Sequence, residues 1–244
     1  MGYWSTLHLF DDNKFYKEVV PALKGESGDL AADCLEFLRF HVLGGISHLS
    51  PSDLNALVEQ TVGNIIAISN SLNATFRIHS EYEKIKDYHE RLLFLSHIDG
   101  HDDFCKFFEY YTFKTCSDFF PHVPLGKGGV SRNFELSIKT LSYAIIGELD
   151  DWNDFFCAGG MGITNWITHE NLRYLYLDKE HLQYSDNERA ESVMMLLDAA
   201  HDHELGFIAG VDMREDRLEL LPGHKLVAPG AWTSEHLKGL YWKR

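Results

Sequence analysis

The sequence predicts a mainly α-helical protein, a single domain over residues 1–244 arranged as a bundle-like array with a small antiparallel β element. Two observations carry this prediction. Apolar residues recur at three- and four-residue steps through several long segments, which is the period of one helix face. Strand-like runs rich in aromatic and β-branched residues occur near the two chain ends, where we expect an N-terminal strand and a C-terminal hairpin. No internal repeat or long polar linker divides the chain, so one domain is expected.

The clearest predicted helix covers residues 50–72. It opens with Ser50-Pro51-Ser52-Asp53, in which the serine hydroxyl can cap a first-turn N–H, the proline supplies a helical φ, and the aspartate faces the positive end of the helix dipole. The apolar stripe that follows consists of Leu54, Leu57, Val58, Thr61, Val62, Ile65, Ile66 and Leu72. A stripe this broad requires neighbouring helices to cover it.

The same patterns place the remaining elements. Helices are expected over residues 14–23, 30–42, 76–96, 102–116, 132–149 and 187–204, and a helix is favoured within 164–184. Strands are expected over residues 3–10, 207–212 and 217–221, the last two forming the hairpin. Prolines and glycines predict a loop over 119–131 and an irregular segment over 150–162. The N-terminal strand could join the hairpin in one sheet.

The charge balance narrows the range of partners. The chain carries 22 basic and 37 acidic residues, a net charge of −15. Nucleic-acid binding depends on neutralising phosphates, and adhesion to an anionic membrane also requires basic residues, so both are disfavoured. A basic protein partner fits this charge, although solubility alone can also explain it.

The cysteines and the N-terminus indicate a cytoplasmic protein. Four widely spaced cysteines form no C-x-x-C pair and lie among apolar neighbours, which is typical of reduced core thiols. The N-terminus shows no basic segment followed by an apolar run, and no run approaches the roughly 20 apolar residues of a membrane span. We therefore expect a reducing, cytosolic compartment.

One group of side chains could hold a metal ion. His97, Asp99, His101 and Asp102 lie within six residues, and imidazoles with carboxylates are ligands for zinc, manganese or iron. The run from Leu95 to His101 resembles the Leu-x-His-Asp-Ile-Gly-His run of the HD-type phosphohydrolases, which implies a metal that activates water. The order is scrambled here, because isoleucine follows His97. The alternative is a helix–helix junction in which the acids stabilise a helix N-terminus.

A second group lies at the end of the helix predicted over 187–204. His201 and His203 are two positions apart, so on an intact helix they are separated by about 200° and cannot converge. His201 continues an apolar stripe, which favours a histidine at the edge of the core. A binuclear metal site would require this group to meet the first one. A metal-dependent hydrolase is therefore the alternative function.

Two glycine-rich runs do not match nucleotide-binding patterns. The run 125–131 contains glycines around Lys127 but lacks the phosphate-loop spacing, so a surface loop is favoured. The run Gly159-Gly160-Met161-Gly162 does not follow a clear strand, so a dinucleotide fingerprint is not supported. The chain also lacks G-x-S-x-G, H-E-x-x-H and the protein-kinase signature.

An acidic run beside a tryptophan gives the preferred functional hypothesis. It consists of Glu148, Asp150, Asp151, Trp152 and Asp154. Acids around an aromatic anchor suit docking onto a basic protein surface, although a solvated loop is the simpler alternative. We therefore expect a non-enzymatic binding protein without a cofactor, of the immunity type, which neutralises a basic toxin. In its most concrete version the toxin degrades nucleic acid. A structural subunit or homo-oligomer is the third alternative.

Overall fold

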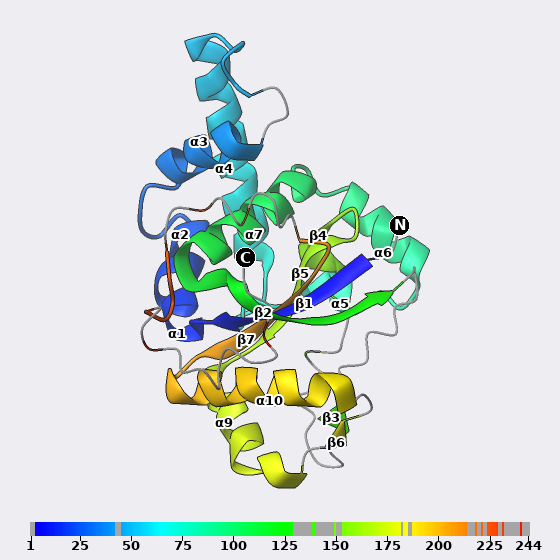
Figure 1. The fold of residues 1–244 in the computed structure, drawn as a ribbon. Helices are drawn as coiled ribbons and strands as arrows, with labels where there is room; N and C mark the ends of the chain where they lie inside the picture. Colours follow the sequence, from blue (N-terminus) through cyan, green and yellow to red (C-terminus); the bar gives the residue numbers. More distant parts are fainter. Residues whose placement is uncertain are drawn as a thin grey trace.

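The protein is built around a five-stranded antiparallel sheet with helices on both faces (Figure 1), as a computed structural model shows. The structure describes residues 3–41, 45–128, 138–139, 149, 153–181, 183–184, 187–213, 218, 221, 224–228, 231 and 240. The predicted mainly helical class with a small β element is therefore wrong. The fold is a mixed α and β arrangement in which the sheet separates two helical layers.

The sheet has the strand order β2-β1-β7-β5-β4. These strands are β1 (Tyr3–Phe10), β2 (Ser117–Gly128), β4 (Cys157–Ala158), β5 (Met161–Ile167) and β7 (Gly206–Val211). The predicted strands at 3–10 and 207–212 are confirmed, and they pair directly, with Phe10 opposite Gly206. A separate two-stranded sheet joins β3 (Ile138–Lys139) to β6 (Gln183–Tyr184).

Two strands that the sequence pattern missed explain the wrong fold class. β2 contains Pro121 and Pro124, which predicted a loop, but this strand lies at the sheet edge, where a missing N–H need not break the ladder. β5 is buried at every position after Met161, so it lacks the alternation that marks a half-exposed strand. In the glycine-rich run at 159–162, Gly159 and Gly160 form the tight turn between β4 and β5, both with positive φ, and Met161 and Gly162 begin β5.

The first helical layer contains most of the N-terminal half of the chain. Its elements are α1 (Asp12–Lys14), η1 (Phe15–Val19), α2 (Val20–Leu23), α3 (Leu30–His41), α4 (Pro51–Ser71), α5 (Ser80–Glu83), α6 (Tyr88–Ser96) and α7 (His101–Cys116). The predicted cap is confirmed, since Ser50 Oγ accepts the Asp53 N–H at 3.2 Å. The single helix expected over 76–96 is wrong, because Asp87 caps a new helix by accepting the Glu90 N–H at 3.0 Å.

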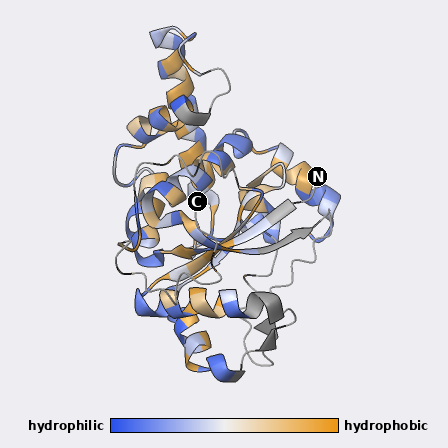
Figure 2. Ribbon diagram, in the orientation of Figure 1, coloured by the Kyte–Doolittle hydropathy of each residue, from blue (hydrophilic) through white to orange (hydrophobic). Residues whose placement is uncertain are grey.

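The second layer consists of α9 (His169–Leu177) and α10 (Asn187–Asp202), with the short turn η3 (Lys179–His181) between them. Strand alternation divides the core between the two layers. Leu7 and Leu9 of β1 face α9 and α10, whereas Phe10 faces α7. In Figure 2 hydrophilic and hydrophobic residues lie side by side along both α9 and α10, as expected for helices with one covered side.

Aromatic rings form the centre of the first layer. Phe108 of α7 packs against a second ring of α7 and against rings from η1, the short helix η2 (Asp154–Phe156), β5 and the segment before α5. These rings are Phe15, Phe76, Phe104, Phe156 and Trp166, with centroid distances of 4.8–6.1 Å from Phe108. This cluster binds α7 to the sheet.

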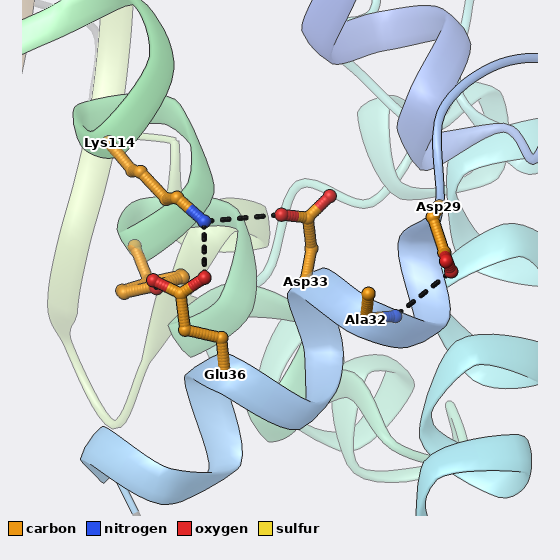
Figure 3. Close-up of polar contacts among 6 residues, drawn as sticks. Asp29, Ala32, Asp33, Glu36 and Lys114 are labelled. Atoms are coloured by element: carbon orange, nitrogen blue, oxygen red, sulfur yellow. Dashed lines mark hydrogen bonds and ion pairs between the residues drawn. The ribbon is translucent and has the colours of Figure 1, made fainter.

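A polar contact ties α3 to α7 (Figure 3). Lys114 Nζ lies 3.2 Å from Asp33 Oδ1 and 2.8 Å from Glu36 Oε2. Tyr110 donates its hydroxyl to the other oxygen of Glu36 at 2.9 Å. The hydrogen bond from Lys114 is the largest cause that lowers the pKa of Glu36. The two acids of α3 therefore serve a structural role.

The elements predicted over 164–184, 132–149 and 217–221 are confirmed only in part or lie largely outside the described residues. The helix favoured within 164–184 is confirmed for α9 only, since residues 164–167 belong to β5. The helix expected over 132–149 falls almost wholly outside the described residues, and its described part includes the strand β3. The second hairpin strand at 217–221 is also largely outside them, and Leu218 is helical. Among the helices that the structure describes, none combines the length and apolarity of a membrane crossing.

Candidate protein-docking surface

The first predicted metal group is dispersed around a helix junction. His97 caps the C-terminus of α6, and its Nδ1 lies 2.6 Å from the Leu93 carbonyl of the same helix. His101 is buried at the start of α7, where its Nε2–H donates to the Phe155 carbonyl at 2.7 Å, and burial lowers its pKa. Asp102 is exposed in the first turn of α7 and Asp99 is exposed before it.

The second predicted metal group is engaged with α9. The His201 ring stacks on Tyr176 with centroids 3.6 Å apart, and its Nδ1 lies 3.3 Å from Asp202 Oδ1. His203 lies in the turn after α10. His101 packs in the α7 layer and His201 in the α10 layer, so the sheet separates the two groups. Within the described ranges, no three His, Cys, Asp or Glu side chains are arranged to hold a metal ion.

Among the described residues, the thiol of Cys105 lies beside the imidazole of His101, as in a nucleophile–base pair. The sulfur lies 3.5 Å from His101 Nε2, but that nitrogen already donates to the Phe155 carbonyl. Burial raises the pKa of the Cys105 thiol well above its usual value. A thiolate is the nucleophilic form, so this pair is arranged for packing and not for attack on a substrate.

Of the five predicted docking residues, Asp154 alone lies in the described part of the chain. Asp154 is only 8% exposed. It lies beside Tyr82 and Cys157 and, after burial, is the next cause that raises the pKa of each. A buried carboxylate cannot meet a partner, so Asp154 is withdrawn from the predicted set. Glu148, Asp150, Asp151 and Trp152 lie outside the described residues.

Acidic and exposed apolar residues coincide instead on the layer formed by α9, η3 and α10. Residues 169–204 contain nine acids and three bases, so this segment of 36 residues carries a net charge of −6. Tyr174 is 53% exposed and Leu177 is 75% exposed. These two residues are three positions apart and so share one side of α9. A contiguous exposed apolar patch with polar residues around it is a mark of an interaction site.

The outward side of this layer is set by the periodicity of α9. Thr168 caps the helix by accepting the Asn171 N–H at 3.4 Å. Leu172 and Leu175 then point into the core. Leu177 is two positions beyond Leu175, which turns it by about 200° toward solvent. We define the acidic helical face as the exposed residues of this layer among those whose side chains are described. They are five acids, one base and two apolar residues: Glu170, Arg173, Tyr174, Leu177, Glu180, Glu191, Asp202 and Glu204.

A side-chain stack holds α9 against α10 beneath this face. Lys179 Nζ lies 3.0 Å from Asp198 Oδ1 and 4.2 Å from the centre of the Tyr176 ring. The hydrogen bond with Asp198 is the largest cause that raises the pKa of Lys179. Because His201 stacks on the same tyrosine, three elements are joined around one ring. Lys179 is engaged in this stack, so its charge is partly compensated by Asp198.

The acidic helical face could have been found from the sequence by a charge count over a longer window. The run at 148–154 is recognisable as an acidic motif because four acids lie within seven residues. The larger excess at 169–204 is spread over a segment with helical periodicity, so no short motif marks it. The exposure of Leu177 depends on where α9 begins, which the periodicity alone left open.

Comparison with models of known protein families, with curated proteins and with solved structures found no significant match.

Proposed function

We propose that this protein is a non-enzymatic binding protein that neutralises a basic protein partner through its acidic helical face. The observation that carries the proposal is the coincidence of a net charge of −6 in residues 169–204 with the exposed side chains of Tyr174 and Leu177. The acids would steer a basic partner toward the face. The two apolar side chains would then be removed from water on contact and supply binding energy.

The partner's chemistry follows from this pairing. It would present lysine and arginine side chains around an apolar depression that accepts Leu177. Enzymes that act on nucleic acids have such basic surfaces, because they bind phosphates. The most concrete form of the proposal is therefore an immunity-type inhibitor of a toxin that degrades nucleic acid.

The proposed compartment is the cytosol. The cysteines at 34, 105, 116 and 157 are all buried and unpaired, which agrees with a reducing environment. The proposal of a non-enzymatic role rests on the separation of the two histidine groups and on the protonated state expected for Cys105.

The test compares two triple variants of equal charge. The first neutralises the face with Glu170→Gln, Glu180→Gln and Asp202→Asn. The control neutralises exposed acids of the other layer with Asp53→Asn, Glu59→Gln and Glu90→Gln. Each tagged protein is used to capture partners from its native host, and captured proteins are identified by mass spectrometry.

The affinity of the captured protein for each variant is then measured by calorimetry at about 50 and 300 mM salt. We expect the first triple variant to weaken binding by at least about tenfold at low salt and to reduce the salt dependence. The control variant should bind as the wild type does. Equal loss in both variants, or a captured partner that is acidic, would refute the proposed face.

The apolar contribution is tested separately. Leu177→Ala and Tyr174→Ala should each weaken binding at both salt concentrations, mainly through faster dissociation. Leu92→Ala on α6 is the matched control, because that leucine is also exposed, at 43%, but lies on the other layer. If neither α9 variant weakens binding, the acidic side chains alone would account for the affinity.

A further inference from the structure

Two buried histidines face each other across the strands β1 and β2. His8 and His122 are register partners, and their ring centroids are 5.2 Å apart. His8 is fully buried and His122 is 5% exposed. The rings of Phe113 and Phe119 pack against His8 at 5.2 and 5.1 Å, so the pair lies in an apolar pocket on the α7 side of the sheet.

One carbonyl oxygen accepts hydrogen bonds from both imidazoles and so places a hydrogen on the Nδ1 atom of each ring. The Phe119 oxygen is 2.9 Å from His8 Nδ1 and 3.1 Å from His122 Nδ1. A carbonyl only accepts, so each Nδ1 carries a hydrogen. The neutral His8 ring then uses Nε2 to accept the hydroxyl of Thr6 at 2.8 Å. Both ring nitrogens of His8 therefore have partners while its imidazole is uncharged.

We propose that His8 and His122 form an acid-sensitive clasp, which holds the edge strand β2 on β1 at neutral pH and releases it in mild acid. Like charges directly opposite each other on neighbouring strands are destabilising. Two imidazolium ions in this pocket would repel each other and would also lack water. β2 is an edge strand of the sheet, so β1 is its one strand neighbour in the described sheet and its release leaves β1 paired with β7.

The pKa shifts of both histidines have the direction that the clasp requires. Burial is the largest cause that lowers the pKa of His8 and of His122, and their mutual repulsion lowers the pKa of His8 further. Each histidine therefore takes up a proton more readily in the unfolded chain. The stabilisation they supply is complete above the unfolded pKa of about 6.5 and is lost as the pH falls below it.

The carboxylate of Asp118, a residue whose backbone contacts His8, does not reverse this effect. Asp118 accepts the Leu226 N–H and lies 3.9 Å from Lys225, so it joins β2 to the segment 224–228. Burial raises the pKa of Asp118 and lowers that of His224 beside it. Protonation of Asp118 is therefore not penalised in the folded state, and acid acts on the clasp through the histidines.

Hydrogen exchange read by mass spectrometry tests the clasp in the whole protein. After correction for intrinsic exchange rates, we expect amides of residues 117–124 to lose protection between pH 7.5 and 5.5, by roughly tenfold for each protonated imidazole. Amides of α4 should keep their protection. Equal loss across both regions, or no loss at 117–124, would overturn the proposal.

A variant separates the clasp from general acid sensitivity. His122→Gln keeps an N–H donor for the Phe119 carbonyl but cannot become charged, so only His8 still takes up a proton. Residues 117–124 should then lose about tenfold in protection at pH 5.5, against about a hundredfold in the wild type. His97→Gln is the control, because His97 is exposed at the end of α6, and it should behave as the wild type does. If His122→Gln fails to fold, NMR titration of the wild-type imidazoles decides. Titration of both histidines with β2 still protected would refute the clasp.

Discussion

Gly206→Ala should destabilise the protein by about 3 kcal/mol, because a single added methyl group has no space at this point. A Cβ built on Gly206 would lie 2.3 Å from the Ile167 carbonyl oxygen, 3.1 Å from Asp12 Oδ1 and 3.2 Å from the His169 N. The nearest of these atoms belongs to the backbone of β5, so it cannot rotate away. Relief requires that the end of β5 move off β7.

The loss of stability expected for Gly206→Ala has two parts. Overpacking at a site that cannot yield costs about 1–3 kcal/mol. The same movement disturbs the 2.9 Å hydrogen bond in which Asp12 Oδ1 accepts the His169 N–H, at a cost of about 1–2 kcal/mol. Urea unfolding followed by circular dichroism should show a midpoint lowered by about 1 M, since the slope for a chain of this size is about 3 kcal/mol per M.

The control is Gly63→Ala on the exposed side of α4. A Cβ built there meets no atom within 4 Å, so alanine should stabilise the helix by up to about 1 kcal/mol. The two variants make the same chemical change and should move the midpoint in opposite directions. A Gly206→Ala protein within about 0.5 kcal/mol of the wild type would contradict the close approach of β7 and β5.

Two further predictions follow from buried and half-buried groups. Lys114→Met should cost about 1 kcal/mol at pH 7, because two partly exposed ion pairs are lost. Since Lys114 lowers the pKa of Glu36, the loss of stability in Lys114→Met should shrink as the pH falls below about 4.5. Urea unfolding at pH 7 and at pH 3.5 measures this change. A loss of stability that is the same at both pH values would argue against the ion pair. The four cysteine thiols should resist a thiol reagent at pH 8 in the native state and react after unfolding, because burial raises the pKa of each, that of Cys34 to about 11. Rapid labelling of native protein would show that at least one thiol is accessible.

Local signals in the sequence determined the helices that carry their own start and stop residues. Ser50 and Pro51 mark the beginning of α4, and a run that is unusually rich in aromatic residues marks α7. The alternating segment at the N-terminus marks β1. In each case the residues that form the element also satisfy its backbone ends or cover one side of it, so the pattern is complete within a short window.

Only the tertiary structure decided the sheet and the candidate surface. β2 tolerates prolines because of its edge position, and β5 shows no alternation because helices cover both of its faces. Whether Asp154 is buried and Leu177 exposed depends on the layers packed around them, because burial is a property of neighbours distant in sequence. The sequence determined the excess of negative charge, and the packing of α9 and α10 on the sheet decided where that charge meets exposed apolar side chains.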